Sequence, residues 1–277
     1  MQMQYQLAVL DLDGTMLSTD GELPVTVRRS IAAVKARGIK VTLATGRRIC
    51  RTLPWARTLE IDIPVVAHNG AVVVNPESGA VVSKQGISLS AANQVIDELL
   101  HLNIPFLVYR GEDQGEMGLL LEQFSQHRTE FLTFIDDQVE LVSKLDLKSN
   151  PIKIAVLGQD YQLNPLLDDW QERYGSAANL IVYRSDNYIG VDFICRDCSK
   201  KSGVEYILKQ LDLDFSRVLA IGDDYNDLAL IEAAGLGAAM GNAPVPVKQA
   251  ADYIAPTNDE DGVAHVLQQF CLPREME

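Results

Sequence analysis

Tyr5-Gln6-Leu7-Ala8-Val9-Leu10-Asp11-Leu12-Asp13-Gly14-Thr15 begins with a short apolar run that ends in two carboxylates and a glycine. A second apolar run, Val218 to Ile221, ends in Gly222-Asp223-Asp224-Tyr225-Asn226-Asp227. Each run has the length of a buried strand, and open parallel sheets bind ligands at the carboxyl ends of their strands. The two stretches therefore predict a parallel sheet with acidic side chains along one edge.

Strands and helices alternate around both stretches. The amino-terminal pattern predicts strands at 5–10, 39–44 and 64–67, helices at 24–37 and 48–59, and a hairpin of 72–74 with 81–82. The carboxyl-terminal pattern predicts helices at 203–211, 226–234 and 261–270, and strands at 218–221, near 238 and at 253–255. Such alternation is typical of an α/β fold built on a Rossmann-like, doubly wound parallel sheet.

The middle of the chain follows a less regular pattern. It predicts helices at 90–101 and 165–174 and strands at 105–109, 152–157, near 180 and near 188, with a glycine-broken stretch after 109. We expect a separate α+β domain over 85–195, inserted into a core made of 1–84 and 196–277.

Composition narrows the class of partner. The 277 residues carry 24 Lys and Arg against 38 Asp and Glu, a net charge of −14. Such a surface repels polyanions, so we expect no nucleic-acid or membrane partner, whereas a small phosphorylated molecule can still bind beside a local cation. The sequence shows neither an apolar run of about 18 residues nor a signal-peptide pattern, and four cysteines are too few for a disulfide framework. We expect a cytoplasmic protein.

The two acidic stretches suit a divalent cation. A strand's period of two puts Asp11 and Asp13 on one side of the chain, and like charges that close disfavour joint ionisation unless a cation lies between them. Hard oxygen ligands on Asp11, Asp13 and Asp223 favour Mg²⁺, while the spacing excludes an EF-hand loop for calcium. The alternatives are an Asx turn at Asp11 to Gly14 and a solvated acidic helix start at Asp223 to Asp227.

An anion site is expected where the second strand ends. Thr45, Gly46 and Arg47 follow that strand and open the next helix, so a hydroxyl, backbone N–H groups and a guanidinium are available to a phosphate. Thr45 can equally act as a helix N-cap. Lys200 precedes another helix, and taken alone it reads as a solvated surface lysine.

Together these four motifs resemble the haloacid dehalogenase superfamily, and specifically its Cof-type phosphatases. The resemblance rests on Asp-x-Asp-Gly-Thr at Asp11 to Thr15, on Thr45, on Lys200 and on Gly-Asp-x-x-Asn-Asp at Gly222 to Asp227. It extends to three further stretches, His68-Asn69-Gly70-Ala71, Met240 to Ala243 and Asn258 to Ala264. The inserted domain is similar in position and size to the family's large C2-type cap. Lys201 stands where the family often has glycine, so either Lys200 or Lys201 can be the lysine of the motif.

The resemblance implies a phosphatase that works through an aspartyl-phosphate and uses Mg²⁺. Asp11 would be the nucleophile, Asp13 the general acid and base, and Lys200 the lysine that holds phosphoryl oxygens. The phosphate would also contact Thr45, Gly46, Arg47 and Asn226. The metal would be held by Asp11, the backbone carbonyl of Asp13 and Asp223, with Asp227 orienting its waters and Lys200.

Three activities remain open for such a chain: hydrolysis of a sugar phosphate, nucleotide or similar metabolite, a phosphomutase reaction on the same fold, and non-catalytic binding of a phosphorylated metabolite. Hydrolysis is favoured, since binding alone would not need both Asp11 and Asp13.

Two further features have competing interpretations. Cys195-x-x-Cys198 is a redox motif, half a zinc site or a pair of plain reduced thiols, the last being favoured, and the polar turn at 184–187 is a substrate contact or an ordinary hairpin tip.

Overall fold

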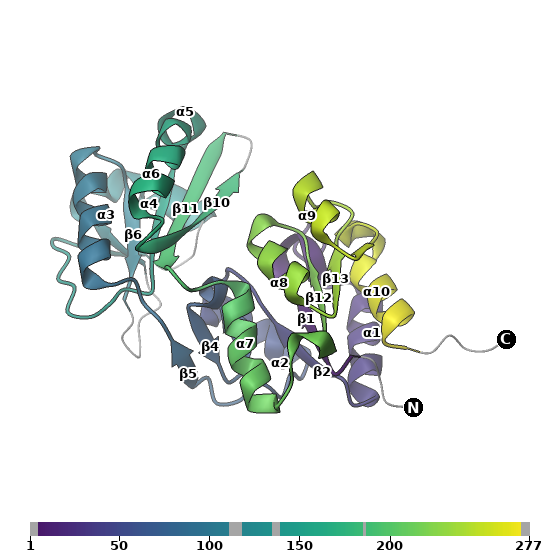
Figure 1. Ribbon diagram of the computed structural model, residues 1–277. Helices are drawn as coiled ribbons and strands as arrows, with labels where there is room; N and C mark the ends of the chain where they lie inside the picture. Colours follow the sequence, from purple (N-terminus) through teal and green to yellow (C-terminus); the bar gives the residue numbers. More distant parts are fainter. Residues whose placement is uncertain (1–4, 111–117, 135–138, 185–186, 273–277) are drawn as a thin grey trace. The chain divides into compact units, whose positions relative to one another are not determined.

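The structure, a computed structural model, describes residues 5–110, 118–134, 139–184 and 187–272 (Figure 1). The chain divides into two compact units, Met1–Ser83 with Ser199–Glu277, and Lys84–Cys198. The chain therefore crosses between them after Ser83 and again after Cys198. None of the helices in the described ranges combines the length and hydropathy that a membrane span requires.

The first unit is built on a five-stranded parallel sheet in the order β14-β13-β12-β1-β2. Its strands are β1 (Leu7–Leu10), β2 (Lys40–Leu43), β12 (Val218–Gly222), β13 (Leu236–Ala239) and β14 (Tyr253–Ile254). All described residues of β1 and β12 are buried, as expected for a central pair covered on both faces. The expected doubly wound α/β fold is confirmed.

Helices cover both faces of this sheet (Figure 1). One face carries α1 (Val25–Ala36) and α10 (Gly262–Phe270), which pack against each other. The remaining helices of the unit are α2 (Ile49–Thr58), α7 (Lys200–Leu211), α8 (Leu228–Ala233) and α9 (Val245–Ala250), and α7 packs against α8. The sequence pattern did not predict α9, whose segment carries Pro244 and Pro246.

The strand expected at 64–67 does not join the parallel sheet. β3 (Val65–Ala67) pairs antiparallel with β4 (Val72–Val74) in a separate three-stranded sheet that also contains β5 (Val81–Lys84). A single parallel bridge, Ala44 to Val66, links it to the end of β2. The expectation was wrong because an apolar run of three residues carries no information about its partner strand.

The second unit holds a six-stranded mixed sheet in the order β10-β11-β9-β6-β7-β8. Its strands are β6 (Phe106–Tyr109), β7 (Gly118–Leu121), β8 (Val139–Val142), β9 (Lys153–Gln159), β10 (Ala178–Arg184) and β11 (Tyr188–Cys195). Its helices are α3 (Leu89–His101), α4 (Arg128–Phe134), α5 (Asp160–Leu163) and α6 (Leu167–Tyr174). Trp170 of α6 packs on Phe193 of β11 with ring centroids 5.5 Å apart and donates a hydrogen bond to Glu98 of α3. The sequence pattern did not predict β7, β8 and α4, which follow the glycine-broken stretch after residue 109. Ser185 and Asp186 of the expected polar turn lie outside the described residues.

Candidate active site

Strand register brings the two acidic stretches together. Leu10 of β1 pairs with Ile221 of β12, so Asp11 and Asp223 leave the sheet at the same edge. The backbone N–H of Asp11 continues the ladder with a 3.1 Å hydrogen bond to the carbonyl of Ile221. Thr45 follows β2 at this edge, since Leu43 pairs with Leu10 on the other side of β1. The edge of the sheet therefore collects side chains from three neighbouring strands.

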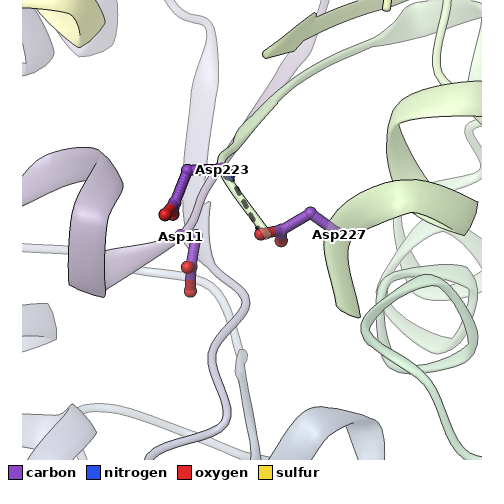
Figure 2. Close-up of side chains that lie close together, drawn as sticks. All are labelled: Asp11, Asp223 and Asp227. Carbon is purple, nitrogen blue, oxygen red and sulfur yellow. Dashed lines mark hydrogen bonds between the residues drawn. The ribbon is translucent and has the colours of Figure 1, made fainter. Parts of the chain in front are cut away.

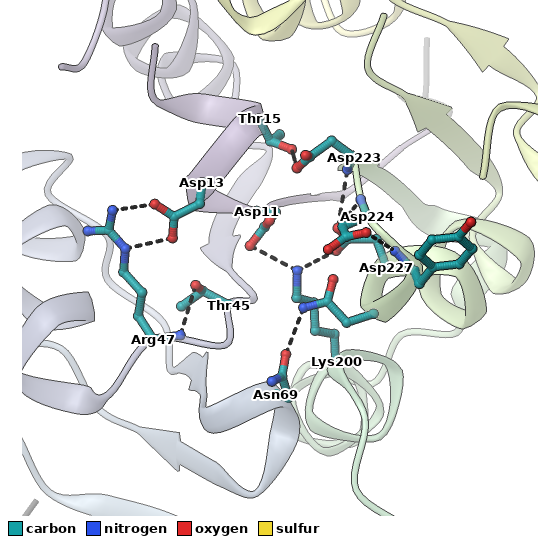
Figure 3. Close-up of polar contacts among 12 residues, drawn as sticks. Asp11, Asp13, Thr15, Thr45, Arg47, Asn69, Lys200, Asp223, Asp224 and Asp227 are labelled. Carbon is teal, nitrogen blue, oxygen red and sulfur yellow. Dashed lines mark hydrogen bonds and ion pairs between the residues drawn. The ribbon is translucent and has the colours of Figure 1, made fainter. Parts of the chain in front are cut away.

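Lys200 lies at the centre of this edge (Figure 3). Its ammonium is fully buried and lies 2.9 Å from Asp11 Oδ1 and 2.7 Å from Asp227 Oδ1. Burial alone would lower the pKa of Lys200, but the two carboxylates raise it above its ordinary value, so the side chain stays charged. The neighbouring Lys201 instead places its ammonium 5.8 Å from the centre of the Phe215 ring.

The position of Lys200 is set by the first turn of α7. Ser199 caps this helix, and its hydroxyl accepts a hydrogen bond from the N–H of Ser202, whose hydroxyl accepts one from the N–H of Ser199. The backbone of Ser199 lies so close to Gly70 that a Cβ at position 70 would overlap its carbonyl. The close approach fixes the start of the helix and with it the direction of Lys200.

Three carboxylates converge beside Lys200. Asp11, Asp223 and Asp227 each offer an oxygen, and these oxygens lie within 4.8 Å of one another (Figure 2). Burial raises the pKa of Asp11 well above its usual range, with Lys200 opposing the shift, and burial raises the pKa of Asp223 to about 7. A raised pKa means that burial disfavours the ionised carboxylates, and a cation bound among the three would favour them.

Asp13 is not part of this cluster. Its side chain is 62% exposed, against 7% for Asp11, and its Oδ2 accepts a 2.7 Å hydrogen bond from Arg47 Nε. A second Arg47 nitrogen contacts Oδ1 of the same carboxylate, which makes the pair bidentate. The expectation that Asp11 and Asp13 share one side of an extended chain was wrong, because β1 ends at Leu10 and Leu12–Met16 forms an irregular turn in which Asp13 and Gly14 have non-helical φ and ψ angles.

Thr45 is buried, but it does not cap the following helix. The N-cap of α2 is Arg48, and the Thr45 hydroxyl instead accepts a 3.2 Å hydrogen bond from the N–H of Arg47. The alternative in which Thr45 caps this helix was therefore wrong, since the local side-chain bond favours a turn there, whereas the helix expected at 48–59 is confirmed as α2. Gly46 and Arg47 lie in the bend between Thr45 and the helix, both half-buried.

Two side chains without a role in the sequence analysis hold Asp223 in place. Thr15 donates a 2.7 Å hydrogen bond to Asp223 Oδ1, and Asn242 donates a 3.4 Å hydrogen bond to Oδ2. Asn242 also donates to the carbonyl of Gly14 at 2.8 Å, so it ties the two acidic stretches together. Thr15 and Asn242 both lie in motifs that carry the family resemblance, and that resemblance was the sequence feature that could have indicated them.

Asn69 holds the side chain of Asn226 in place by a hydrogen bond. Its Oδ1 accepts a 2.9 Å hydrogen bond from Asn226 Nδ2, and it lies in a turn where His68, Asn69 and Gly70 all have positive φ. Such backbone costs about 1–3 kcal/mol per strained residue and is found where a site requires it. With Nδ2 thus engaged, the buried Oδ1 of Asn226 has no hydrogen-bond partner among the described residues.

The donors present fit Mg²⁺. The cluster offers carboxylate oxygens, which Mg²⁺ prefers, and the unpartnered Oδ1 of Asn226 is an acceptor suited to a water on such an ion. Asp227 is already engaged by Lys200 and by the N–H groups of Asp223 and Asp224, both at 3.2 Å. Asp11 and Asp223 are therefore the carboxylates best placed to hold a metal directly.

Comparison with known proteins identifies the family. The family model for haloacid dehalogenase-like hydrolases matches residues 8–267. The chain belongs to this family. The resemblance to its Cof-type phosphatases is thereby confirmed, and so is the expected enzyme class, a phosphatase of the haloacid dehalogenase type.

Two curated relatives and one solved structure match this chain along nearly their whole length. Phosphatase YwpJ of Bacillus subtilis (strain 168) is 26% identical, with 96% of this chain and 99% of the relative covered. The 5-amino-6-(5-phospho-D-ribitylamino)uracil phosphatase YcsE of the same organism is 27% identical, with 96% of each covered. A haloacid dehalogenase-like hydrolase from Bacteroides thetaiotaomicron has a crystal structure that superposes with a TM-score of 0.80 at 28% identity, covering 96% of this chain and 99% of that one.

Proposed function

We propose that this phosphatase hydrolyses the phosphomonoester of a small phosphorylated metabolite in two steps, through a phosphorylated Asp11. The observation that carries the proposal is the buried Lys200 ammonium between Asp11 and Asp227. It fixes one oxygen of Asp11, leaving Oδ2 as the nucleophile, and places a positive charge where phosphoryl oxygens would lie. Asp227 holds the lysine in that position.

In the first step Asp11 Oδ2 forms a bond to phosphorus while the bond from phosphorus to the leaving oxygen breaks. Asp13 donates a proton to that oxygen, so that an alcohol leaves instead of an alkoxide. In the second step water attacks phosphorus, Asp13 takes a proton from it, and the Asp11 carboxylate is regenerated. Arg47 supports this role because it holds the exposed Asp13 side chain in one orientation (Figure 3).

The remaining residues would bind the phosphoryl group. The Thr45 hydroxyl, the N–H of Gly46, the amide of Asn226 and the Lys200 ammonium are the donors that we assign to its oxygens, with Arg47 available when it is not engaged by Asp13. Mg²⁺, held by Asp11, the backbone carbonyl of Asp13 and Asp223, would neutralise negative charge on the same oxygens. We assign Asp227 to the orientation of metal-bound water.

The substrate that we propose is a sugar phosphate or a nucleotide-like metabolite. The name of the YcsE relative supports this class, since its substrate carries a phosphate on a ribityl chain attached to a small ring. The net charge of −14 argues against a polyanion in place of a small molecule.

The test is release of inorganic phosphate from a panel of sugar phosphates and nucleotides with purified protein and Mg²⁺. We expect turnover of some members, none with Asp11→Asn, and a phosphorylated Asp11 peptide after rapid quench of Asp13→Asn with p-nitrophenyl phosphate. A phosphomutase would convert a sugar phosphate to its isomer without phosphate release. A binding protein would bind members of the panel without changing them. Either result would overturn the proposal.

A further inference from the structure

The two cysteines of Cys195-x-x-Cys198 lie where the chain leaves the second unit. Cys195 is the last residue of β11, and Cys198 is the last residue of that unit, directly before the Ser199 cap of α7. Neither thiol has a part in the proposed phosphatase reaction. Both are free thiols in the structure.

The backbone holds the two cysteines at a distance that a disulfide can span. The N–H of Cys198 donates a 3.0 Å hydrogen bond to the carbonyl of Cys195, which closes a four-residue turn. A turn of this kind brings its first and fourth Cα atoms within about 7 Å, and disulfides join Cα atoms about 4.4 to 6.8 Å apart. A 2.8 Å hydrogen bond from Asn179 Nδ2 to the carbonyl of Cys198 fixes the end of the turn.

The two sulfurs also point to the same place. Cys195 Sγ and Cys198 Sγ lie 3.6 Å and 3.7 Å from one acceptor, Oε1 of Gln85. Gln85 belongs to the segment by which the chain enters the second unit. Because one amide oxygen accepts from both thiols, both side chains extend toward Gln85, and Cys198 also interacts with the side chain of Cys195.

The two thiols differ in accessibility. Cys195 is half-buried, whereas Cys198 is 1% exposed. A reagent in solution can therefore reach Cys195 and is kept from Cys198, which is the arrangement of an attacking thiol with a resolving thiol behind it. Burial, and next the proximity of Cys195, raise the pKa of Cys198, so the reduced form gains no stabilisation from a buried thiolate. A disulfide is a strong oxidant when its reduced form is stabilised by a thiolate. No buried thiolate stabilises the reduced form of this pair, so we expect its disulfide to be a weak oxidant.

We propose that Cys195 and Cys198 are a redox pair that a small-molecule disulfide, such as oxidised glutathione, converts reversibly to an intramolecular disulfide. Cys195 Sγ, as the thiolate, attacks one sulfur of the reagent, whose other sulfur leaves as a thiol after taking a proton. Cys198 Sγ then loses its proton and attacks Cys195 Sγ, which releases the second small thiol. The protein loses two hydrogen atoms and two electrons, and one reagent disulfide becomes two thiols. Gln85 then loses both of its sulfur donors.

The test is incubation of the folded full-length protein with oxidised glutathione, followed by intact mass measurement and peptide mapping. Cys50 is exposed and would form an adduct of its own, so the background carries Cys50→Ser. We expect the loss of two hydrogen atoms, a Cys195–Cys198 linked peptide without a glutathione adduct, and recovery of both thiols with dithiothreitol.

Two single variants separate the steps. Cys198→Ser should stop at a stable glutathione adduct on Cys195, because the resolving thiol is gone. Cys195→Ser should slow modification of Cys198 by about tenfold or more relative to that of Cys195 in the parent, because Cys198 is buried. If a variant fails to fold, the product that forms in the parent protein still tests the proposal. A lasting glutathione adduct on Cys195 of the parent, or a linked peptide that forms only in urea, would overturn the proposal.

Discussion

Asp13 and Arg47 form a bidentate ion pair, although Asp13 is only two residues from Asp11. The wide turn at Leu12–Met16 separates the two carboxylates, so Asp11 lies with Lys200 in the interior and Asp13 lies with Arg47 at the surface. In the proposed reaction the guanidinium holds the Asp13 carboxylate, the form that takes a proton from water, in one orientation and is released from it when Asp13 is protonated. Arg47 is then a positioning residue for proton transfer as well as a phosphate ligand.

We expect Arg47→Met to affect substrates according to their leaving groups. General acid catalysis raises the rate by about 10²- to 10⁴-fold. Without Arg47 the Asp13 side chain would be free to rotate, and part of this rate enhancement would be lost. For a sugar phosphate, whose alkoxide needs a proton, kcat should fall about 100-fold, whereas for p-nitrophenyl phosphate the phosphorylation step should fall less than about 10-fold. Steady-state and rapid-quench kinetics on both substrates measure this.

Arg51→Lys is the control, because Arg51 lies exposed on α2, the helix that follows Arg47, and its kinetics should match the parent. Arg47→Lys keeps the charge and loses the planar fork, so an intermediate effect is expected. An equal fall for both leaving groups with Arg47→Met would show that Arg47 acts on phosphate alone.

Metal binding should depend on Asp223 and not on its neighbour Asp224. Asp223 belongs to the carboxylate cluster, whereas Asp224 caps the following turn by accepting a 2.8 Å hydrogen bond from the N–H of Tyr225. Asparagine caps as well as aspartate, so Asp224→Asn keeps that role and removes one charge. Titration calorimetry should show Mg²⁺ affinity reduced at least about 10-fold by Asp223→Asn and little changed by Asp224→Asn.

Removal of the metal by a chelator tests whether phosphate release, and not only Mg²⁺ binding, depends on this site. EDTA should abolish phosphate release, and added Mg²⁺ should restore it. Full turnover in the presence of the chelator, or equal loss of affinity in both variants, would contradict the assignment of the metal ligands.

Gly14 and Gly21 allow the space beside Asp223 to be tested apart from backbone strain. Both have positive φ, 69° and 78°, and a Cβ at Gly14 would overlap the Asp223 carboxylate, whereas none of the described atoms lies within 4 Å of a Cβ at Gly21. Alanine at either position should lower the free energy of unfolding by about 1–2 kcal/mol, the cost of a left-handed residue. Only Gly14→Ala should also lose Mg²⁺ affinity and turnover. Unaltered catalysis in Gly14→Ala would mean that Asp223 can move without consequence.

The strands that position the site could be predicted from the sequence because each is a buried apolar run ended by acidic or turn-forming residues. That pattern marks β1 and β12 directly, and the alternation of elements gives the fold class. The pattern fails for β7 and β8, which lie in a stretch broken by glycines and whose pairing depends on residues distant in the chain.

Side-chain direction at the site could not be predicted with the same success. Spacing alone puts Asp13 beside Asp11, yet β1 ends at Leu10 and the irregular turn at Leu12–Met16 leaves Asp13 exposed beside Arg47. Asp227 enters the cluster in its place because Gly222 has no side chain, since a Cβ there would overlap the Asp227 carboxylate. Both effects depend on contacts between residues that a linear pattern does not relate.

Glu98 should make the second unit sensitive to acid. Its pKa lies below the ordinary value of 4.5, mainly because it accepts hydrogen bonds from Arg173, with burial opposing, and Tyr174 and Trp170 also donate to it. A carboxyl group with a lowered folded pKa binds protons less well in the folded than in the unfolded state. Its contribution is therefore fully present above about pH 4.5 and is lost as pH falls through the folded pKa.

The variant Glu98→Gln should lower the free energy of unfolding of this unit by about 1 kcal/mol at pH 7, the upper end for ion pairs near a surface. The difference from the parent should shrink toward zero as pH falls through the lowered pKa of folded Glu98, where the group becomes protonated in both folded and unfolded chains. Trp170 contacts Glu98 at 3.3 Å and reports on this unit, so its fluorescence in urea is the measurement, in a Trp55→Phe background that removes the other tryptophan. Glu172→Gln is the control, because Glu172 lies exposed on α6, the helix that carries Trp170 and Arg173, and should change stability by less than about 0.5 kcal/mol at any pH. A Glu98→Gln effect that stays constant between pH 7 and pH 3 would show that the glutamate acts through packing and not through its charge.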